Sequence, residues 1–140
     1  MLKRIIAVIT GVVVGFIVVF IGDATTHKLN GGHAPDGMDR EALSGYVSNI
    51  PVYVLVIMVL FWMLAAFLGG FIAAKINKDS WKQVSLITGG ILFAATLLNL
   101  AMIPHPAWMW IAAVVLIIPA AFLGGKIALP KVLSPPAVNP

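Results

Sequence analysis

Residues 52–74 read VYVLVIMVLFWMLAAFLGGFIAA, an apolar run without a single charged residue. A bilayer core of about 30 Å is crossed by roughly 20 residues of helix, so this run is long enough to span it. Three further apolar stretches can do the same, of which the first is the shortest; they are residues 5–22, 84–103 and 107–129. We therefore predict an all-α integral membrane protein with four transmembrane helices.

The composition of the whole chain agrees with this fold class. Of its 140 residues, 61% are apolar and 10% are charged, whereas soluble domains are about 45–50% apolar and about 25% charged. A soluble chain of this length could not bury so much apolar surface. The start of the chain resembles a signal peptide, but residues 22–25 form a poor cleavage site, so we predict an uncleaved first span.

The basic residues indicate the orientation of the spans. If the spans alternate in direction, seven of the nine basic residues fall on one side: Lys3, Arg4, Lys75, Lys78, Lys82, Lys126 and Lys131. Because short cytoplasmic loops are enriched in Lys and Arg, we predict that both termini are cytoplasmic and that residues 23–49 form an outer loop. The net charge of +4 then records topology and requires no nucleic-acid partner.

A hexapeptide is repeated in the chain. The sequence AAFLGG occurs at residues 65–70 and again at residues 120–125, and at the same offset Pro51 corresponds to Pro106. A weaker match, ITG, links residues 9–11 with residues 87–89. The pattern predicts two helical hairpins of the same topology, which is a parallel internal repeat about an axis along the membrane normal. A chance match of small apolar residues is the alternative.

Small residues at a spacing of four lie on one face of each predicted span. Such faces let helix backbones approach closely, which is a main route to helix association in lipid. We predict that the glycines of these faces pack helices together: Gly11, Gly15, Gly69, Gly70, Gly89, Gly90, Gly124 and Gly125. The packing partner is another span of the same chain, a partner subunit or a second copy; a glycine-lined path for a solute is the weakest alternative.

The predicted outer loop contains a second structural signal. Apolar side chains recur on one helical face within residues 37–49, Asp36 can cap the N-terminus, and Pro51 ends the run. We predict a short amphipathic helix on the outer membrane surface or over the bundle. Residues 1–132 then form a single transmembrane domain, and residues 133–140 a flexible proline-rich tail.

Polar side chains at the outer boundary of the spans are the candidates for a functional site. Asp23 and His27 are four residues apart, so they share a face if the first helix continues that far. Asn99 lies near the outer end of the third span, and His105 lies in the turn before the fourth. We predict an outer polar cluster of these four residues; the alternative is that each is an ordinary helix-end or turn residue.

The same pattern bears on metal binding and catalysis. Asp23, His27, His33 and His105 could supply zinc ligands only if the fold brought three or four of them together. The chain has no cysteine, no HExxH motif, no phosphate-binding loop and no acid in spans two to four. We therefore predict no bound metal or cofactor and no enzymatic activity.

Several segments resemble a group of small four-span bacterial inner-membrane proteins that has no assigned activity. They are the Lys3-Arg4 start, His27-Lys28, Asp39-Arg40-Glu41-Ala42-Leu43, Ile103-Pro104-His105-Pro106 and the doubled AAFLGG. The resemblance covers nearly the whole chain. It implies a multi-pass protein of the bacterial inner membrane and assigns no active residue.

Three functions remain open from the sequence. The first is an accessory or scaffold subunit that packs through its Gly and Ala faces against a larger membrane complex or a second copy. The second is a small solute or ion transporter or channel that works as a homo-oligomer. The third is a metal-dependent membrane enzyme that uses the outer histidines. In each case the bilayer itself is a partner of the apolar helix surfaces.

Overall fold

The computed structural model describes residues 1–31 and 39–129, and this part of the chain is helical, with no strand. The helices are α1 (Leu2–Asn30), α2 (Arg40–Ser48), α3 (Val52–Ile76), α4 (Trp81–Met102) and α5 (Ala107–Ile127). All except α2 are long and apolar enough to cross a membrane. The prediction of a multi-pass helical membrane protein is therefore confirmed, while the predicted tail, 133–140, lies outside the described residues.

Helix α1 extends well beyond the predicted span of residues 5–22. The hydropathy falls at Asp23, but nothing there breaks the backbone hydrogen bonding, and Thr26 donates to the carbonyl oxygen of Gly22 within the helix. The helix ends only at Gly31, whose φ of 63° is left-handed and whose N–H donates to the carbonyl of His27. A helix of 29 residues is about 43 Å long, which exceeds the bilayer core.

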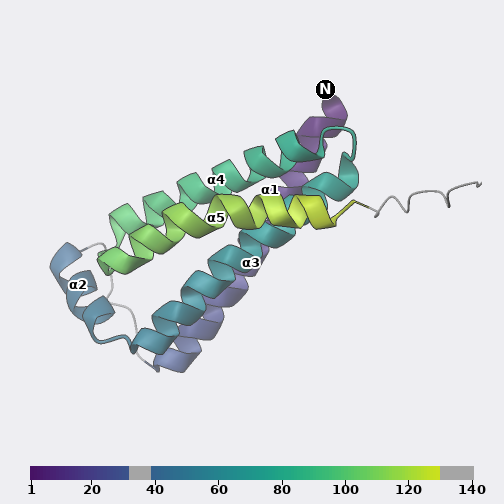
Figure 1. The fold of residues 1–140 in the computed structure, drawn as a ribbon. Coiled ribbons are helices and arrows are strands. Elements are labelled where there is room, and N and C mark those ends of the chain that lie inside the picture. Colours follow the sequence, from purple (N-terminus) through teal and green to yellow (C-terminus); the bar gives the residue numbers. More distant parts are fainter. Residues whose placement is uncertain (32–38, 130–140) are drawn as a thin grey trace, which may run out of the picture.

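Helix α3 contacts each of the other long helices, whereas α1 and α5 do not contact each other in the described part of the chain. Figure 1 shows that α4 and α5 lie close to α1 and α3 at the end where the chain begins, and diverge from them toward the end where α2 lies. We call these the N-terminal end and the α2 end. The bundle is therefore packed at the first end and splayed at the second.

Glycines produce the close packing near the N-terminal end. A Cβ added to Gly11 of α1 would lie 2.5 Å from the carbonyl oxygen of Gly69 in α3, and one added to Gly69 would lie 2.8 Å from the carbonyl oxygen of Gly11. Because a real Cβ does not come so close to a backbone oxygen, only glycine permits this approach of the two helices.

The two copies of AAFLGG lie against each other in α3 and α5. An added Cβ at Gly70 would collide with the backbone of Ala121, and one at Gly124 would collide with the backbone of Phe67. In both copies the Ala-Ala and Gly-Gly pairs are buried: Ala65, Ala66, Gly69, Gly70, Ala120, Ala121, Gly124 and Gly125.

The remaining predicted packing glycines differ from one another. An added Cβ at Gly15 would meet the Leu92 side chain at 2.6 Å, one at Gly89 would meet Ala121 Cβ at 2.5 Å, and one at Gly125 would collide with Ser85. At Gly90 it would meet nothing within 4 Å. Gly90 therefore makes no close helix contact in the described chain, since neighbouring helix positions point about 100° apart.

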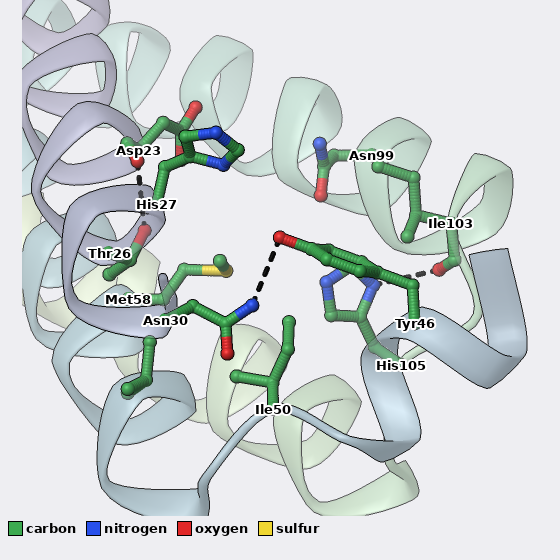
Figure 2. Close-up of a pocket in the computed structure, with 11 residues that line it drawn as sticks. Asp23, Thr26, His27, Asn30, Tyr46, Ile50, Met58, Asn99, Ile103 and His105 are labelled. Carbon is green, nitrogen blue, oxygen red and sulfur yellow. Dashed lines mark hydrogen bonds between the residues drawn. The ribbon is translucent and has the colours of Figure 1, made fainter. Parts of the chain in front are cut away.

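Helix α2 is short, and one of its faces is buried against the rest of the protein. Asp39 is its N-cap, and its side chain accepts a hydrogen bond from the N–H of Glu41; the predicted cap, Asp36, lies outside the described residues. Leu43 and Val47 are buried. The Asn30 side chain of α1 donates to the Tyr46 hydroxyl at 3.1 Å, and Figure 2 shows this bond between the two helices.

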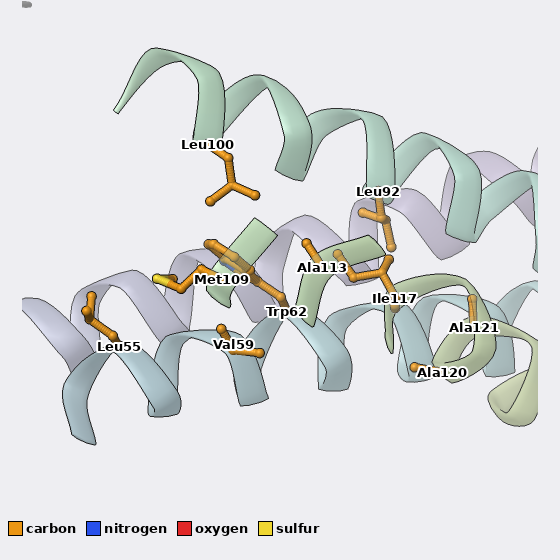
Figure 3. Close-up of a cluster of buried hydrophobic side chains, with 11 residues drawn as sticks. Leu55, Val59, Trp62, Leu92, Leu100, Met109, Ala113, Ile117, Ala120 and Ala121 are labelled. Atoms are coloured by element: carbon orange, nitrogen blue, oxygen red, sulfur yellow. The ribbon is translucent and has the colours of Figure 1, made fainter. Parts of the chain in front are cut away.

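The largest apolar core joins α3, α4 and α5. Figure 3 shows Leu92 and Leu100 of α4 directed toward Met109 and Ile117 of α5. Trp62 of α3 is only 5% exposed and belongs to this cluster. The core thus places a buried indole near the splayed end of the bundle, where it borders the candidate site.

Candidate functional site

A pocket of about 280 Å³ lies at the α2 end of the bundle and is shown in Figure 2. Its lining comes from α1, α2, α3, α4 and the turns after α2 and α4: Asp23, Thr26, His27, Asn30, Tyr46, Ile50, Val54, Met58, Asn99, Ile103 and His105. Figure 2 shows the side chains of His27 and Asn99 directed into it from opposite helices. All four residues of the predicted polar cluster therefore line one pocket.

Helix α1 supplies the polar wall of the pocket. Asp23, His27 and Asn30 are separated by four and three residues, so they lie on one face of the extended helix. Thr26 lies beside them, but it is 3% exposed and its hydroxyl is directed to the carbonyls of Gly22 and Asp23. The pocket therefore exists because α1 continues past its apolar segment.

The turn between α4 and α5 fixes His105 opposite that wall. His105 stands between two prolines, and its Nδ1 lies 2.7 Å from the carbonyl oxygen of Ile103. A carbonyl oxygen can only accept, so Nδ1 carries the proton and Nε2 keeps a lone pair when the ring is neutral. Burial lowers the pKa of His105, while the bond to Ile103 acts in the opposite direction. The ring is therefore neutral at pH 7 and offers an acceptor.

A second, smaller cavity of about 130 Å³ adjoins the first. The two cavities share Asp23 and Asn99. The other lining residues of the second are nearly all apolar: Phe16 and Val19 of α1, Trp62 and Ala65 of α3, and Leu92, Ala95 and Thr96 of α4. The Thr96 hydroxyl is bonded to the carbonyl of Leu92 in its own helix. We call the two the polar pocket and the apolar cavity.

Sequence reasoning missed several members of the polar pocket. Asn30 carries a usable signal, because it continues the helical spacing of Asp23 and His27. Tyr46 and Met58 carry none, since their places depend on how α2 and α3 are oriented in the folded chain. Among the described residues, no three His, Asp or Glu side chains lie close enough to hold a metal ion; His33 lies outside those residues.

The chemistry available in the polar pocket is that of hydrogen bonding and charge recognition. Asp23 is the one described lining residue with a formal charge at pH 7 when histidines are counted as neutral. His105, Asn99 and Asn30 add uncharged acceptors and donors.

Comparisons of the chain with protein-family models, curated proteins and solved structures give no match.

Proposed function

We propose that this protein is a non-catalytic membrane protein that binds a small ligand bearing a polar group in the polar pocket. The observation that carries the proposal is that Asp23, His27, Asn99 and His105, which come from three separate segments, line the same pocket. Ligand sites in proteins combine apolar walls with a few convergent polar groups, and this pocket has both.

The proposal places the α2 end outside the cell membrane. The basic residues at the start of α1, around the turn between α3 and α4 and at the end of α5 support cytoplasmic termini in a bacterial inner membrane. The ligand would then enter from the outer side. The doubled AAFLGG, buried at equivalent positions in α3 and α5, supports an origin of the two hairpins by duplication.

The glycine faces favour ligand binding over an accessory role. Of the eight glycines on which the predicted accessory role depends, all but Gly90 approach other helices of the same chain closely. These faces are therefore occupied within the described chain. They give a partner subunit little glycine surface on which to dock, and the polar pocket becomes the stronger basis for function.

Native mass spectrometry of the protein purified from its own membranes in mild detergent tests ligand binding. We expect a discrete one-to-one adduct on the wild type that is lost in Asn99→Phe, which fills the pocket. Leu98→Phe is the matched control, because Leu98 neighbours Asn99 and is 65% exposed. Absence of any adduct, or an equal adduct on both variants, would refute the proposal. Stoichiometric purification with a larger complex would instead favour the accessory role.

Transport by a homo-oligomer is the second candidate. It is favoured by the position of the apolar cavity, which adjoins the polar pocket at Asp23 and Asn99 and reaches Leu92 about midway along α4. Beyond Leu92 the helices close at Gly11 and Gly69. Ethanolamine is a suitable probe, because its ammonium group is opposite in charge to the Asp23 carboxylate of the pocket. A transporter should give flux of radiolabelled ethanolamine into proteoliposomes that is abolished by Asn99→Phe and retained in Leu98→Phe. Binding without flux excludes transport of this probe.

A further inference from the structure

The two cavities adjoin each other and differ in chemical character. Asp23 and Asn99 belong to both linings and mark the boundary between them. On the α2 side lie the imidazoles and amides of the polar pocket; on the other side lie Phe16, Leu92 and Ala95. A ligand that fills both must itself have a polar and an apolar part.

The apolar cavity lies between α1 and α4 at the level of the apolar spans. Phe16 is two turns of helix, or about 10 Å, deeper along α1 than Asp23. The same helices expose apolar side chains beside the cavity, with Phe20 74% and Leu98 65% exposed. In a bilayer these side chains face acyl chains, so the cavity lies next to the hydrocarbon of the membrane.

The contact between α1 and α4 defines where the apolar cavity ends. An added Cβ at Gly15 would meet the Leu92 side chain, and one at Gly11 would lie 3.1 Å from the Cγ2 of Thr88. These contacts close the two helices on the N-terminal side. The space therefore accepts a chain that enters from the α2 side and stops near Leu92.

The polar pocket favours a head group with several N–H donors. Asp23 supplies a carboxylate, which accepts hydrogen bonds and attracts a cation. His105 supplies the lone pair of Nε2, and the Asn99 amide has an oxygen that accepts. A primary ammonium group has one positive charge and three donors, which matches these acceptors in sign and number.

We infer that the ligand is a membrane amphiphile with a primary ammonium head group, bound with its head in the polar pocket and one hydrocarbon chain in the apolar cavity. This inference rests on the proposed function and specifies its ligand. The amphiphile comes from the outer leaflet, whose chains lie beside the apolar cavity. A head group without N–H donors leaves the Asp23 and His105 acceptors without hydrogen-bond partners from the ligand and binds more weakly.

Trp62 provides the reporter for a direct test, since its indole lines the apolar cavity. Trp81→Phe, Trp108→Phe and Trp110→Phe together leave Trp62 as the single tryptophan. This protein is placed in nanodiscs that contain phospholipid brominated in the middle of one chain, a quencher of tryptophan at contact. The same brominated chain is presented on phosphatidylethanolamine, phosphatidylcholine or phosphatidylglycerol.

We expect half-maximal quenching of Trp62 at about a tenfold lower fraction of phosphatidylethanolamine than of the other two lipids, a preference of about 1.4 kcal/mol. Asp23→Asn should abolish the preference, while Asp79→Asn, the same change at an exposed site near the N-terminal end, should keep it. Ala95→Leu should reduce quenching by filling the apolar cavity, whereas Ala94→Leu, which is exposed on the same helix, should not.

Equal quenching by all three lipids would overturn the inference, as would a preference that survives Asp23→Asn. Equal quenching by phosphatidylethanolamine and phosphatidylcholine would also overturn it, because the N–H donors would then contribute nothing. Displacement of the lipid by free ethanolamine at an equal concentration would also overturn the inference, because the ligand would then be a water-soluble amine and the hydrocarbon chain would contribute nothing. In each of these cases the adduct lost in Asn99→Phe would still support ligand binding itself.

Discussion

The imidazole of His105 lies edge-on against the indole of Trp62, with ring centroids 6.3 Å apart and ring planes at 68°. His105 lines the polar pocket and Trp62 lines the apolar cavity. The pair therefore links a turn outside the helices to the buried core of α3. Packing against a fixed indole, together with the bond to Ile103, holds the imidazole in one orientation.

Protonation of His105 is expected to destabilise the protein. The pKa of His105 is lowered from 6.5 in the folded protein, so the unfolded chain binds the proton more readily. The contribution of the neutral ring is complete above about pH 6.5 and is lost as the pH falls toward the lowered pKa. Thermal unfolding in detergent, followed across this range, should show a Tm that decreases with acidification, and His105→Gln should flatten the decrease.

Asn99→Leu is the control for this pH dependence, because it removes a polar pocket residue that does not titrate. It should keep the wild-type slope of Tm against pH. An unchanged slope in His105→Gln would show that His105 is not the group responsible.

The close approach of α1 and α3 predicts opposite effects of the same substitution at two glycines. Gly11→Ala should lower the free energy of unfolding by about 1–3 kcal/mol, because its Cβ would overlap the carbonyl oxygen of Gly69. Gly90→Ala meets open space and should raise it by about 0.5–1 kcal/mol through helix propensity. Unfolding titrations in mixed micelles measure both, and equal changes in the two variants would contradict the helix contact.

Two buried hydroxyls of α4 should also respond in opposite directions. Ser85 donates to the carbonyl oxygen of Gly70 at 3.1 Å, so Ser85→Ala should cost about 1 kcal/mol. The Thr88 hydroxyl is buried and has no hydrogen-bond partner in the described structure, so Thr88→Val should stabilise by about 1 kcal/mol. Measuring the free energy of unfolding of both variants against the wild type tests this prediction. If Thr88→Val lowers it, the Thr88 hydroxyl has a hydrogen-bond partner.

The hydrogen bond between Asn30 and Tyr46 predicts the local stability of α2. Tyr46→Phe removes the acceptor of the Asn30 amide and should weaken the docking of α2 by about 1 kcal/mol. Amide hydrogen exchange should then be about fivefold faster in α2 and unchanged in α3. Tyr53→Phe, at an exposed tyrosine, is the control; the same acceleration in both variants would rule out a specific role for the bond.

The proposed orientation can be tested directly because the chain has no cysteine. Lys28→Cys and Lys78→Cys place single thiols at exposed positions near the α2 end and the N-terminal end. A membrane-impermeant maleimide should label Lys28→Cys in intact cells and Lys78→Cys only after permeabilisation. The reverse result would place the α2 end in the cytoplasm.

The sequence predicts the number and approximate position of the long helices, because each is an uninterrupted apolar run. It misplaces the end of α1 because hydropathy reports where lipid stops, whereas the helix stops where Gly31 adopts a left-handed conformation. That difference matters for the site, since Thr26, His27 and Asn30 belong to the extension.

The shape of the site was beyond sequence reasoning for a different reason. Asp23 and Asn99 are far apart in the chain, and their shared place depends on the angle at which the two pairs of helices diverge. Contacts between the pairs elsewhere in the bundle, such as the one between Gly70 of α3 and Ala121 of α5, bear on that angle. For the same reason the sequence cannot tell that Gly89 approaches Ala121 while Gly90 meets open space.

The separation between the glycine contacts and the pocket has a mechanical consequence. Gly11 lies about 24 Å along α1 from His27. A rotation of α1 by about 5° about the contact between Gly11 and Gly69 would move the pocket wall by about 2 Å at His27. For the proposed ligand, such a rotation would change the affinity through a contact that the ligand does not touch.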